Sequence, residues 1–199
     1  MRLLLATRNE HKLREFARLL DGAGSGGGWR LVPLPAGVRM PPEDGDTFAA
    51  NALGKARAAA AATGEVSIAD DSGIGAAALG GAPGVRSARY AGEDATDEQN
   101  LQKLRREVPV GSALEYVCVI AYADPLEGSE RVFEGRCTGR LAAGPRGERG
   151  FGYDPVFLPD DSPPAPKGLT MAELSDEQKD AISHRGHAVR ALVAWLTAG

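Results

Sequence analysis

The residues best suited to chemistry lie in one short stretch, Ile68-Ala69-Asp70-Asp71-Ser72-Gly73. We expect the apolar run at 66–69 to form a strand that ends at the two carboxylates, whose side chains then point to opposite faces because side chains alternate along a strand. A carboxylate there is a hard oxygen ligand of the kind that magnesium takes. The same residues also suit a solvated turn, so the other motifs must decide between a turn and a site.

Phosphates could be held at the turn Thr7-Arg8-Asn9-Glu10-His11-Lys12. It joins a predicted strand to a predicted helix, where free backbone N–H groups and the helix dipole favour an anion. Asn9 can cap the helix, and Lys12 adds a positive charge one turn further on. Taken alone, Lys12 could equally be a surface lysine on an amphipathic helix.

Basic residues also gather near the start of a second predicted helix, where Lys179 precedes Ser183-His184-Arg185. Positive charges there oppose the helix dipole, and such a local conflict suggests function. A histidine in the core remains the alternative for His184. His184 and His187 are three residues apart, but no cysteine or third histidine is nearby, so we do not predict a zinc site.

Aromatic residues separated by glycine occur in a loop, Phe151-Gly152-Tyr153-Asp154. Such a loop can stack a base, and Asp154 can accept a hydrogen bond from a base or ribose edge. The alternative is an aromatic pair that fills the core below the loop. Glu43, in a loop rich in proline and glycine, is a possible second carboxylate for a metal or a solvated side chain.

Hydrophobic periodicity predicts the elements that must position these motifs. The chain opens as strand, turn and helix, an order that suits an α/β fold. The glycine-rich segment 22–28 contains a formal G-x-G-x-x-G, but it follows a helix and precedes a strand, the opposite of a dinucleotide loop, so we interpret it as a flexible surface connection. We expect strands at 3–6, 29–34, 66–71, 112–124, 130–141 and 156–158, and helices at 10–20, 47–62, 87–90, 96–108, from 175 and from 183.

Composition limits the class of protein. A chain of 199 residues with 43% apolar and 25% charged residues fits one domain, with or without two lobes. The net charge of −4 argues against a broad basic surface for nucleic acid. Two cysteines are too few for a disulfide framework, and we expect buried free thiols. The apolar runs are too short for a signal peptide or a membrane span, which predicts a cytoplasmic protein that binds no membrane.

Five motifs in this order resemble the inosine triphosphate pyrophosphatase family, whose members act on nonstandard purine nucleoside triphosphates. The resemblance covers nearly the whole chain. The matching segments are Ala6-Thr7-Arg8-Asn9-Glu10-His11-Lys12, Ala69-Asp70-Asp71-Ser72-Gly73, the stretch 80–90 (Gly-Gly-Ala-Pro-Gly-Val-Arg-Ser-Ala-Arg-Tyr), Phe151-Gly152-Tyr153-Asp154-Pro155 and Ala181-Ile182-Ser183-His184-Arg185-Gly186.

The resemblance implies an α/β fold: an elongated mixed central sheet flanked by helices, with two lobes and a nucleotide cleft between them. Residues 1–199 would then form a single pyrophosphatase domain, usually as a homodimer. It also implies magnesium-dependent hydrolysis of ITP, dITP and XTP to the monophosphate and pyrophosphate, which removes these nucleotides from the pool.

The resemblance also assigns roles to residues. Asp71 would be the catalytic carboxylate and a magnesium ligand, with Glu43 near the metal, while Asp70 and Lys55 would give support. Two departures stand out, because many members have glycine where Arg8 stands and an acidic residue where Ala77 stands. The substrate-binding residues would be Thr7, Arg8, Asn9, Glu10, His11, Lys12, Ser72, Phe151, Gly152, Tyr153, Asp154, Lys179, His184 and Arg185.

Two alternatives to this function remain. One is a pyrophosphatase for pyrimidine or modified nucleotides, as in the similarly folded septum-inhibitor family, but the turn after the first strand of that family is rich in serine and arginine, unlike residues 7–12 here. The other is a nucleotide sensor without turnover, but the presence of Asp71, Glu43 and Lys12 argues against it.

Overall fold

A six-stranded sheet forms the centre of the fold, in the strand order β2-β1-β3-β4-β5-β6. The computed structural model describes residues 1–23, 28–161 and 168–198. β1 runs parallel to β2 and β3, whereas β5 and β6 are antiparallel, so the predicted mixed α/β sheet is confirmed. The strands are β1 (Arg2–Leu5), β2 (Arg30–Pro33), β3 (Ser67–Ala76), β4 (Ala113–Asp124), β5 (Ser129–Leu141) and β6 (Phe157–Pro159).

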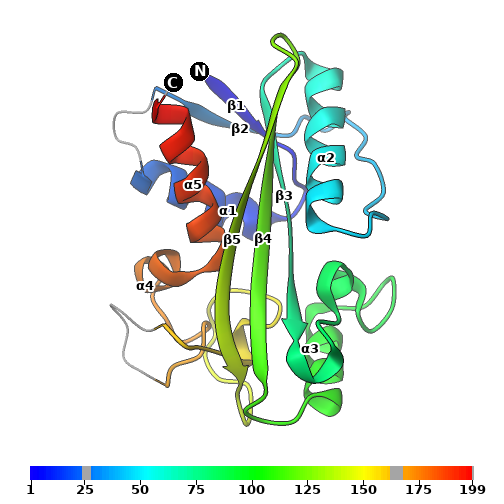
Figure 1. Ribbon diagram of the computed structural model, residues 1–199, viewed down its shortest axis with the longest axis vertical. Helices are drawn as coiled ribbons and strands as arrows, with labels where there is room; N and C mark the ends of the chain where they lie inside the picture. The colour runs from blue at the N-terminus through cyan, green and yellow to red at the C-terminus, as the bar shows by residue number, and fades with distance from the viewer. Residues whose placement is uncertain (24–27, 162–167, 199) are drawn as a thin grey trace. The chain divides into compact units, whose positions relative to one another are not determined.

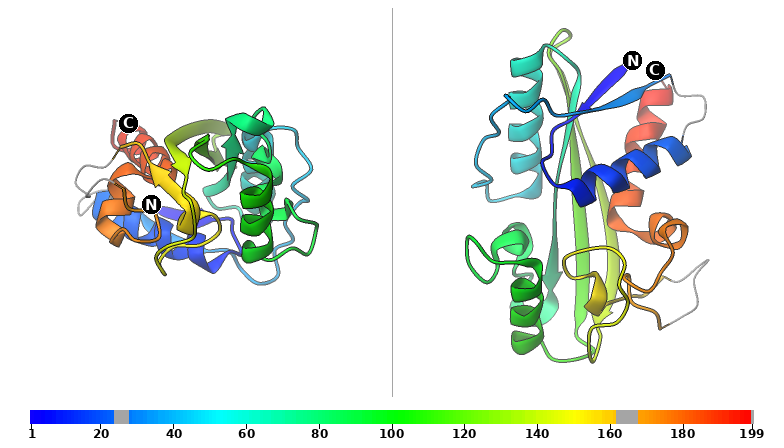
Figure 2. Two further views of the ribbon diagram at one scale, coloured as in Figure 1. Left: turned by 90° about the horizontal axis from the view of Figure 1, so that it is seen from below. Right: turned by 180° about the vertical axis from the view of Figure 1, so that it is seen from behind.

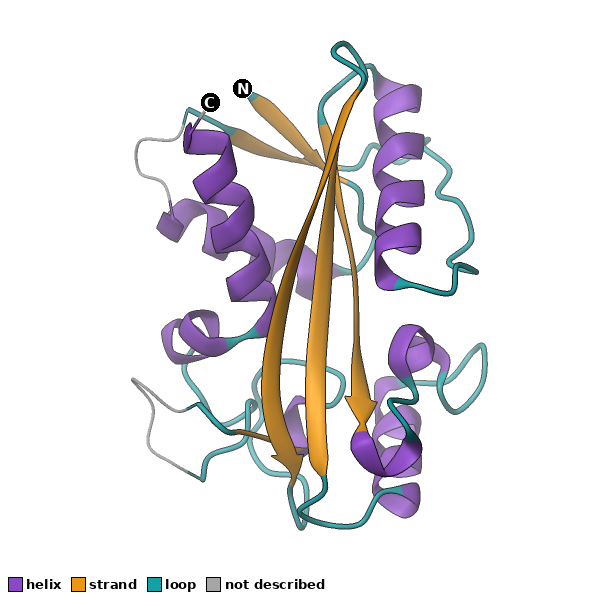
Figure 3. Cartoon of the chain, viewed as in Figure 1, coloured by secondary structure: helices purple, strands orange, loops and turns teal. Residues whose placement is uncertain are grey.

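Polar caps fix where the helices begin, and Figure 3 shows these helices and the strands along the chain. The side chains of Asn9, Thr47, Thr96, Ser175 and Ser183 each accept a hydrogen bond from a backbone N–H of the first turn. The helices are α1 (Glu10–Ala23), α2 (Phe48–Thr63), α3 (Asp97–Glu107), α4 (Asp176–Ile182) and α5 (His184–Ala198), with short 3-10 turns η1 (Ala77–Leu79), η2 (Gly84–Arg89) and η3 (Asp154–Val156).

The chain divides into two compact units. Unit 1 contains residues 1–71, 118–135 and 188–199, and unit 2 contains residues 72–117 and 136–187. The boundary in β3 falls between Asp71 and Ser72. Each unit has its own hydrophobic core. The cleft that the family resemblance implies stays a prediction.

In unit 1, helices cover both faces of the sheet. Leu3 and Leu5 of β1 are fully buried and pack in one cluster with Phe16 of α1 and Leu192 of α5. In Figures 1 and 2, α1 and α5 lie together and α2 lies on the other side of β3. The buried face of α2 carries alanines, which have the highest helix propensity and little bulk, together with Asn51 and Lys55. Both layers hold β3, which carries the two carboxylates.

In unit 2, α3 and the short strand β6 contribute to a common core. Leu101 and Leu104 of α3 and Phe157 of β6 are buried in one cluster. Ile74 and Ala76, from the second half of β3, belong to the same cluster. Burying each such large apolar side chain contributes roughly 1.5–3 kcal/mol, so this core anchors the loop at 144–154 that follows β5.

One predicted boundary is wrong. β3 does not end at Asp70 and Asp71 but continues to Ala76. Ser72 and the glycines after it suggested a turn, yet Ile74 is fully buried and its N–H donates to Ser87 Oγ at 2.8 Å. These tertiary contacts keep the backbone extended, since glycine has little preference of its own. The two carboxylates therefore lie in the middle of a buried strand.

Other expectations can be compared directly. Cys118 and Cys137 are free and buried, as predicted, and burial raises the pKa of the Cys137 thiol to about 12. In the described part of the chain, no helix has the length and apolarity needed to cross a membrane. Residues 24–27 of the glycine-rich segment, and residues 162–167, lie outside the described residues.

Candidate active site

Two neighbouring carboxylates on β3 form the centre of the site in unit 1. Asp70 and Asp71 are 1% and 5% exposed. Asp70 Oδ2 lies 2.9 Å from the Lys12 ammonium at the start of α1. Asp71 Oδ2 accepts a hydrogen bond of 2.8 Å from Asn51 Nδ2 on α2. The two side chains thus bond to different helices, as expected from alternation along a strand.

A buried ammonium group connects these carboxylates to the loop before α2. Lys55 Nζ donates to Glu43 Oε1 and to the backbone oxygen of Asp70, the latter at 2.6 Å. Burial lowers the pKa of Lys55, but the charges of Asp70, Glu43 and Asp71 outweigh it and raise the pKa above its ordinary value. Lys55 therefore stays protonated and balances the buried negative charge.

The ionisation of Asp71 depends on its neighbours. Burial raises the pKa of its carboxyl group above the ordinary value of aspartic acid, and the charge of Glu43 raises it further. The hydrogen bond from Asn51 and the charges of Lys55 and Lys12 act in the opposite direction. A carboxylate with a raised pKa is a better proton acceptor, so the burial of Asp71 suits it to act on a water molecule.

Arg8 has a contact that its sequence position did not suggest. Its Nη2 donates to the backbone oxygens of Pro35, Ala36 and Val38 at 2.8–3.0 Å. The guanidinium thereby holds the loop that runs toward Glu43. A contact between Arg8 and a triphosphate stays a prediction.

The rest of the phosphate turn is arranged as a helix start. Asn9 Oδ1 accepts from the backbone N–H groups of His11 and Lys12 at 2.9 and 3.1 Å, and Thr7 Oγ1 accepts from Asn9 N at 3.2 Å. The exposed side chain of Glu10 lies in the first turn of α1. Lys12 connects this turn to β3 through its ion pair with Asp70.

A second cluster, in unit 2, is built around Asp154. Its Oδ2 accepts from Lys179 Nζ at 2.7 Å and from the N–H of Phe151 at 2.9 Å, and its Oδ1 accepts from the hydroxyl of Tyr116 at 3.2 Å. Asp154 is 3% exposed and Lys179 5%. Asp154 therefore shapes the loop that presents Phe151, and its predicted contact with a base or ribose stays a prediction.

The ring of Phe151 lies near two cations. Lys179 Nζ is 5.4 Å and the guanidinium carbon of Arg185 is 5.7 Å from its centroid, distances at which cation–π attraction operates. Arg185 is 1% exposed and donates to Ser72 Oγ at 3.0 Å. The cluster thus combines an aromatic face with fixed hydrogen-bond donors.

Tyr153 and His184 were each predicted either to belong to a site or to fill the core. Tyr153 is buried and its hydroxyl donates to the backbone oxygen of Ser87 at 2.7 Å, so it follows the core alternative. His184 is 5% exposed and stacks on Tyr116, with ring centroids 4.5 Å apart. Gly152 N donates to Asp97 Oδ2 at 2.9 Å, which ties the loop to the first turn of α3.

Sequence reasoning missed Asn51 and Tyr116. Asn51 stands four residues before Lys55 on α2, so the two share a helix face, and this spacing was the available signal. Tyr116 lies in an apolar strand and showed no signal. Because the bond from Asn51 to Asp71 spans 20 residues in the chain, no local motif contains it.

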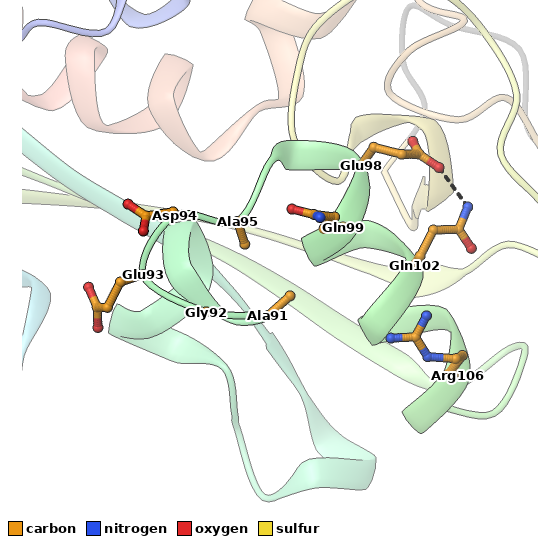
Figure 4. Close-up of a pocket in the computed structure, with 9 residues that line it drawn as sticks. All are labelled: Ala91, Gly92, Glu93, Asp94, Ala95, Glu98, Gln99, Gln102 and Arg106. Carbon is orange, nitrogen blue, oxygen red and sulfur yellow. Dashed lines mark hydrogen bonds between the residues drawn. The ribbon is translucent and has the colours of Figure 1, made fainter.

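A groove of about 720 Å³ lies elsewhere in unit 2, between the turn at 91–95 and α3. Figure 4 shows Glu93, Asp94, Glu98 and Arg106 along it, with Gln102 donating to Glu98 at 2.7 Å. None of the predicted site residues lines this groove.

Asp71 and Glu43 carry the hard oxygen atoms that magnesium takes as ligands. Among the described residues, no group of three or more histidine, cysteine, aspartate or glutamate side chains is arranged to hold a metal ion. Magnesium is commonly bound through one or two carboxylates together with substrate phosphates. Asp71 and Glu43 influence each other electrostatically, and a magnesium site at this pair stays a prediction.

Comparisons with known proteins give a consistent result. The model of the Ham1 family matches residues 3–195. A dITP/XTP pyrophosphatase from Deinococcus radiodurans is 47% identical over 97% of this chain and 92% of its own, and one from Mycolicibacterium paratuberculosis is 48% identical over 98% and 95%. A HAM1 protein from Coxiella burnetii has a similar structure, with a TM-score of 0.85 at 38% identity and full coverage of both chains.

We predict that Gly150→Ala weakens nucleotide binding. Gly150 has φ of +73°, and an added Cβ would lie 2.1 Å from Asp154 Oδ2 and 3.1 Å from Lys179 Nζ, so the ion pair must move. Gly111→Ala is the matched control, because Gly111 has φ of +80° with no atom near an added Cβ. Both variants should lose about 1 kcal/mol of stability from backbone strain. Only Gly150→Ala should raise KM for the nucleotide, by about tenfold or more; equal KM values in both variants would contradict this role of the loop.

Proposed function

The chain belongs to the Ham1 family, and on that premise we propose that it hydrolyses the nonstandard purine nucleoside triphosphates ITP, dITP and XTP to the monophosphate and pyrophosphate. The observation that carries this proposal is the pair Asp70 and Asp71, buried together on β3 and balanced by the ammonium groups of Lys12 and Lys55. Removal of the nucleotides from the pool before they are used follows from such an activity.

The phosphates are assigned to the cluster in unit 1. Water must attack the α-phosphorus with pyrophosphate leaving, and catalysis of phosphoryl transfer consists mainly of positioning and charge stabilisation. Asp71 orients the water and accepts its proton, a role that its raised pKa supports. Lys12, at the start of α1, neutralises phosphate oxygens together with the backbone N–H groups of the turn.

Magnesium is part of this proposal, with Asp71 and Glu43 as the residues that would hold it. When bound, the ion supplies a positive charge that stabilises the leaving pyrophosphate. Lys55 bonds to Glu43 and to the backbone of β3. It therefore keeps the carboxylate of Glu43 close to β3 whether or not magnesium is bound.

The base is assigned to the cluster in unit 2, where Phe151 can stack it and Arg185 can donate hydrogen bonds. Hypoxanthine and xanthine present an oxygen acceptor at position 6, whereas adenine presents an amino donor there. Donors that face this position leave adenine with donor against donor, and unpaired buried groups of this kind discriminate strongly. Guanine shares the oxygen, so its rejection requires a second device at its 2-amino group.

Two further expectations belong to the proposal. The family resemblance supports a homodimer, and the composition and cysteine usage support a cytoplasmic location. Neither is needed for the chemistry assigned to Asp71.

We predict a clear order of substrates. With magnesium present, ITP and XTP should release pyrophosphate at least 100-fold more efficiently, measured as kcat/KM, than ATP, because a mismatched donor costs several kcal/mol. Activity should disappear when EDTA removes the divalent ion. Equal rates on ATP would refute the donor arrangement, and release of no pyrophosphate from any of the four purine triphosphates (GTP included) would refute the function.

Asp71→Asn should lower kcat by about 10³-fold or more while the fold is retained, because the proton acceptor is lost. Since burial raises the pKa of Asp71, the ionised carboxylate opposes folding at neutral pH. The variant should therefore melt at or above the wild-type temperature at pH 7, and this difference should fade as the pH falls below the ordinary pKa of aspartic acid, where both side chains are neutral. Near wild-type turnover in a folded variant would remove Asp71 from its assigned role.

A further inference from the structure

We propose that Asn51 is a positioning residue that holds Asp71 and the loop carrying Glu43 in one fixed arrangement, a role that rests on the function proposed above. Asn51 lies on α2 and is 5% exposed. It belongs neither to the phosphate turn at 7–12 nor to the aromatic loop at 151–154. Its side chain nevertheless contacts both parts of the carboxylate cluster.

The amide of Asn51 uses its two ends differently. Nδ2 donates to Asp71 Oδ2 at 2.8 Å, and Oδ1 accepts from the backbone N–H of Gly45 at 2.8 Å. A backbone N–H can only donate, so Gly45 determines which end of the amide faces it. The other end must then present a donor to Asp71. The orientation of this buried amide is therefore decided by its partners.

Lys55 repeats this connection one helical turn later. Residues i and i+4 of a helix share a face, and Lys55 donates to Glu43 Oε1 and to the backbone oxygen of Asp70. Asn51 and Lys55 thus each join the loop at 43–45 to the strand at 70–71. The spacing between Glu43 and Asp71 is set by one rigid helix.

The chain comes very close to Asn51 at Gly45. A Cβ added at Gly45 would lie 2.7 Å from Asn51 Oδ1 and 3.1 Å from the Cβ of Ala50. With a Cβ at this position, either the amide of Asn51 or the loop must shift. The absence of a side chain at Gly45 thus allows the short contact between the loop and the amide.

This arrangement predicts an effect on rate rather than on binding. Lys12 and the cluster in unit 2, to which the phosphates and the base are assigned, do not bond to Asn51 in the described structure. Loss of Asn51 leaves these contacts in place but lets the carboxylate and the loop shift. Loss of a group that orients a catalytic side chain typically costs 10- to 100-fold in activity.

The first test compares Asn51→Leu with Asn100→Leu. Asn100 is also a buried asparagine, and its amide bonds to the backbone at Ala88 and Ala91, in unit 2. Both variants should be destabilised by the loss of buried hydrogen bonds. We expect Asn51→Leu to lower kcat 10- to 100-fold with KM for ITP within about threefold, and Asn100→Leu to leave kcat within twofold of wild type, both measured below their unfolding temperatures. A kcat for Asn51→Leu within twofold of wild type would overturn the proposal.

The second test measures the melting temperature and does not depend on activity. It is therefore carried out whether or not Asn51→Leu folds. Asn51→Asp places a carboxylate against Asp71 and should lower the melting temperature at pH 7. The exchanged pair Asn51→Asp with Asp71→Asn restores a donor against an acceptor and still accepts from Gly45. The exchange should recover at least half of the loss in melting temperature, yet remain inactive. No recovery would refute a direct bond between the two side chains. If the wild-type protein releases no pyrophosphate, the proposed function fails. The stability test still shows whether the side chains of Asn51 and Asp71 are bonded to each other.

Discussion

The burial of two neighbouring carboxylates on β3 is the constraint on which the rest of the site depends. Moving a charged carboxylate out of water is costly unless it is paired and hydrogen-bonded. Lys12 forms an ion pair with Asp70, Asn51 donates a hydrogen bond to Asp71, and the charge of Lys55 interacts with both carboxylates. The start of α1, the buried face of α2 and the loop before α2 must therefore all meet the same strand, and the surrounding apolar core keeps them there.

The cluster in unit 2 follows the same logic with different chemistry. Asp154 is buried and accepts hydrogen bonds from Lys179, Phe151 and Tyr116. Its charge shapes a loop whose aromatic ring, that of Phe151, lies beside the guanidinium of Arg185. Ser72 follows Asp71 directly in β3, so one continuous strand supplies residues to both clusters.

Much of this could be predicted from the sequence because its signals are local. The cap at Thr47 and the capping box formed by Ser175 and Gln178 fix helix starts within a few residues. The order of the motifs along the chain indicated the family. The end of β3 was predicted wrongly, since the burial of Ile74 decides the backbone there. The contacts of Arg8 and Asn51 could not be predicted either, because their partners lie 20 or more residues away in the chain. The roles of the site residues toward a nucleotide stay predictions.

The proposed function depends on attack of water at the α-phosphorus, with Asp71 orienting the water and accepting its proton. It is tested most directly by hydrolysing ITP with the protein in water enriched in oxygen-18 and analysing the products by mass spectrometry. Attack at the α-phosphorus places one heavy oxygen atom in inosine monophosphate and none in pyrophosphate. Label in pyrophosphate, or release of labelled orthophosphate in its place, would show attack at another phosphorus and would contradict the assignment.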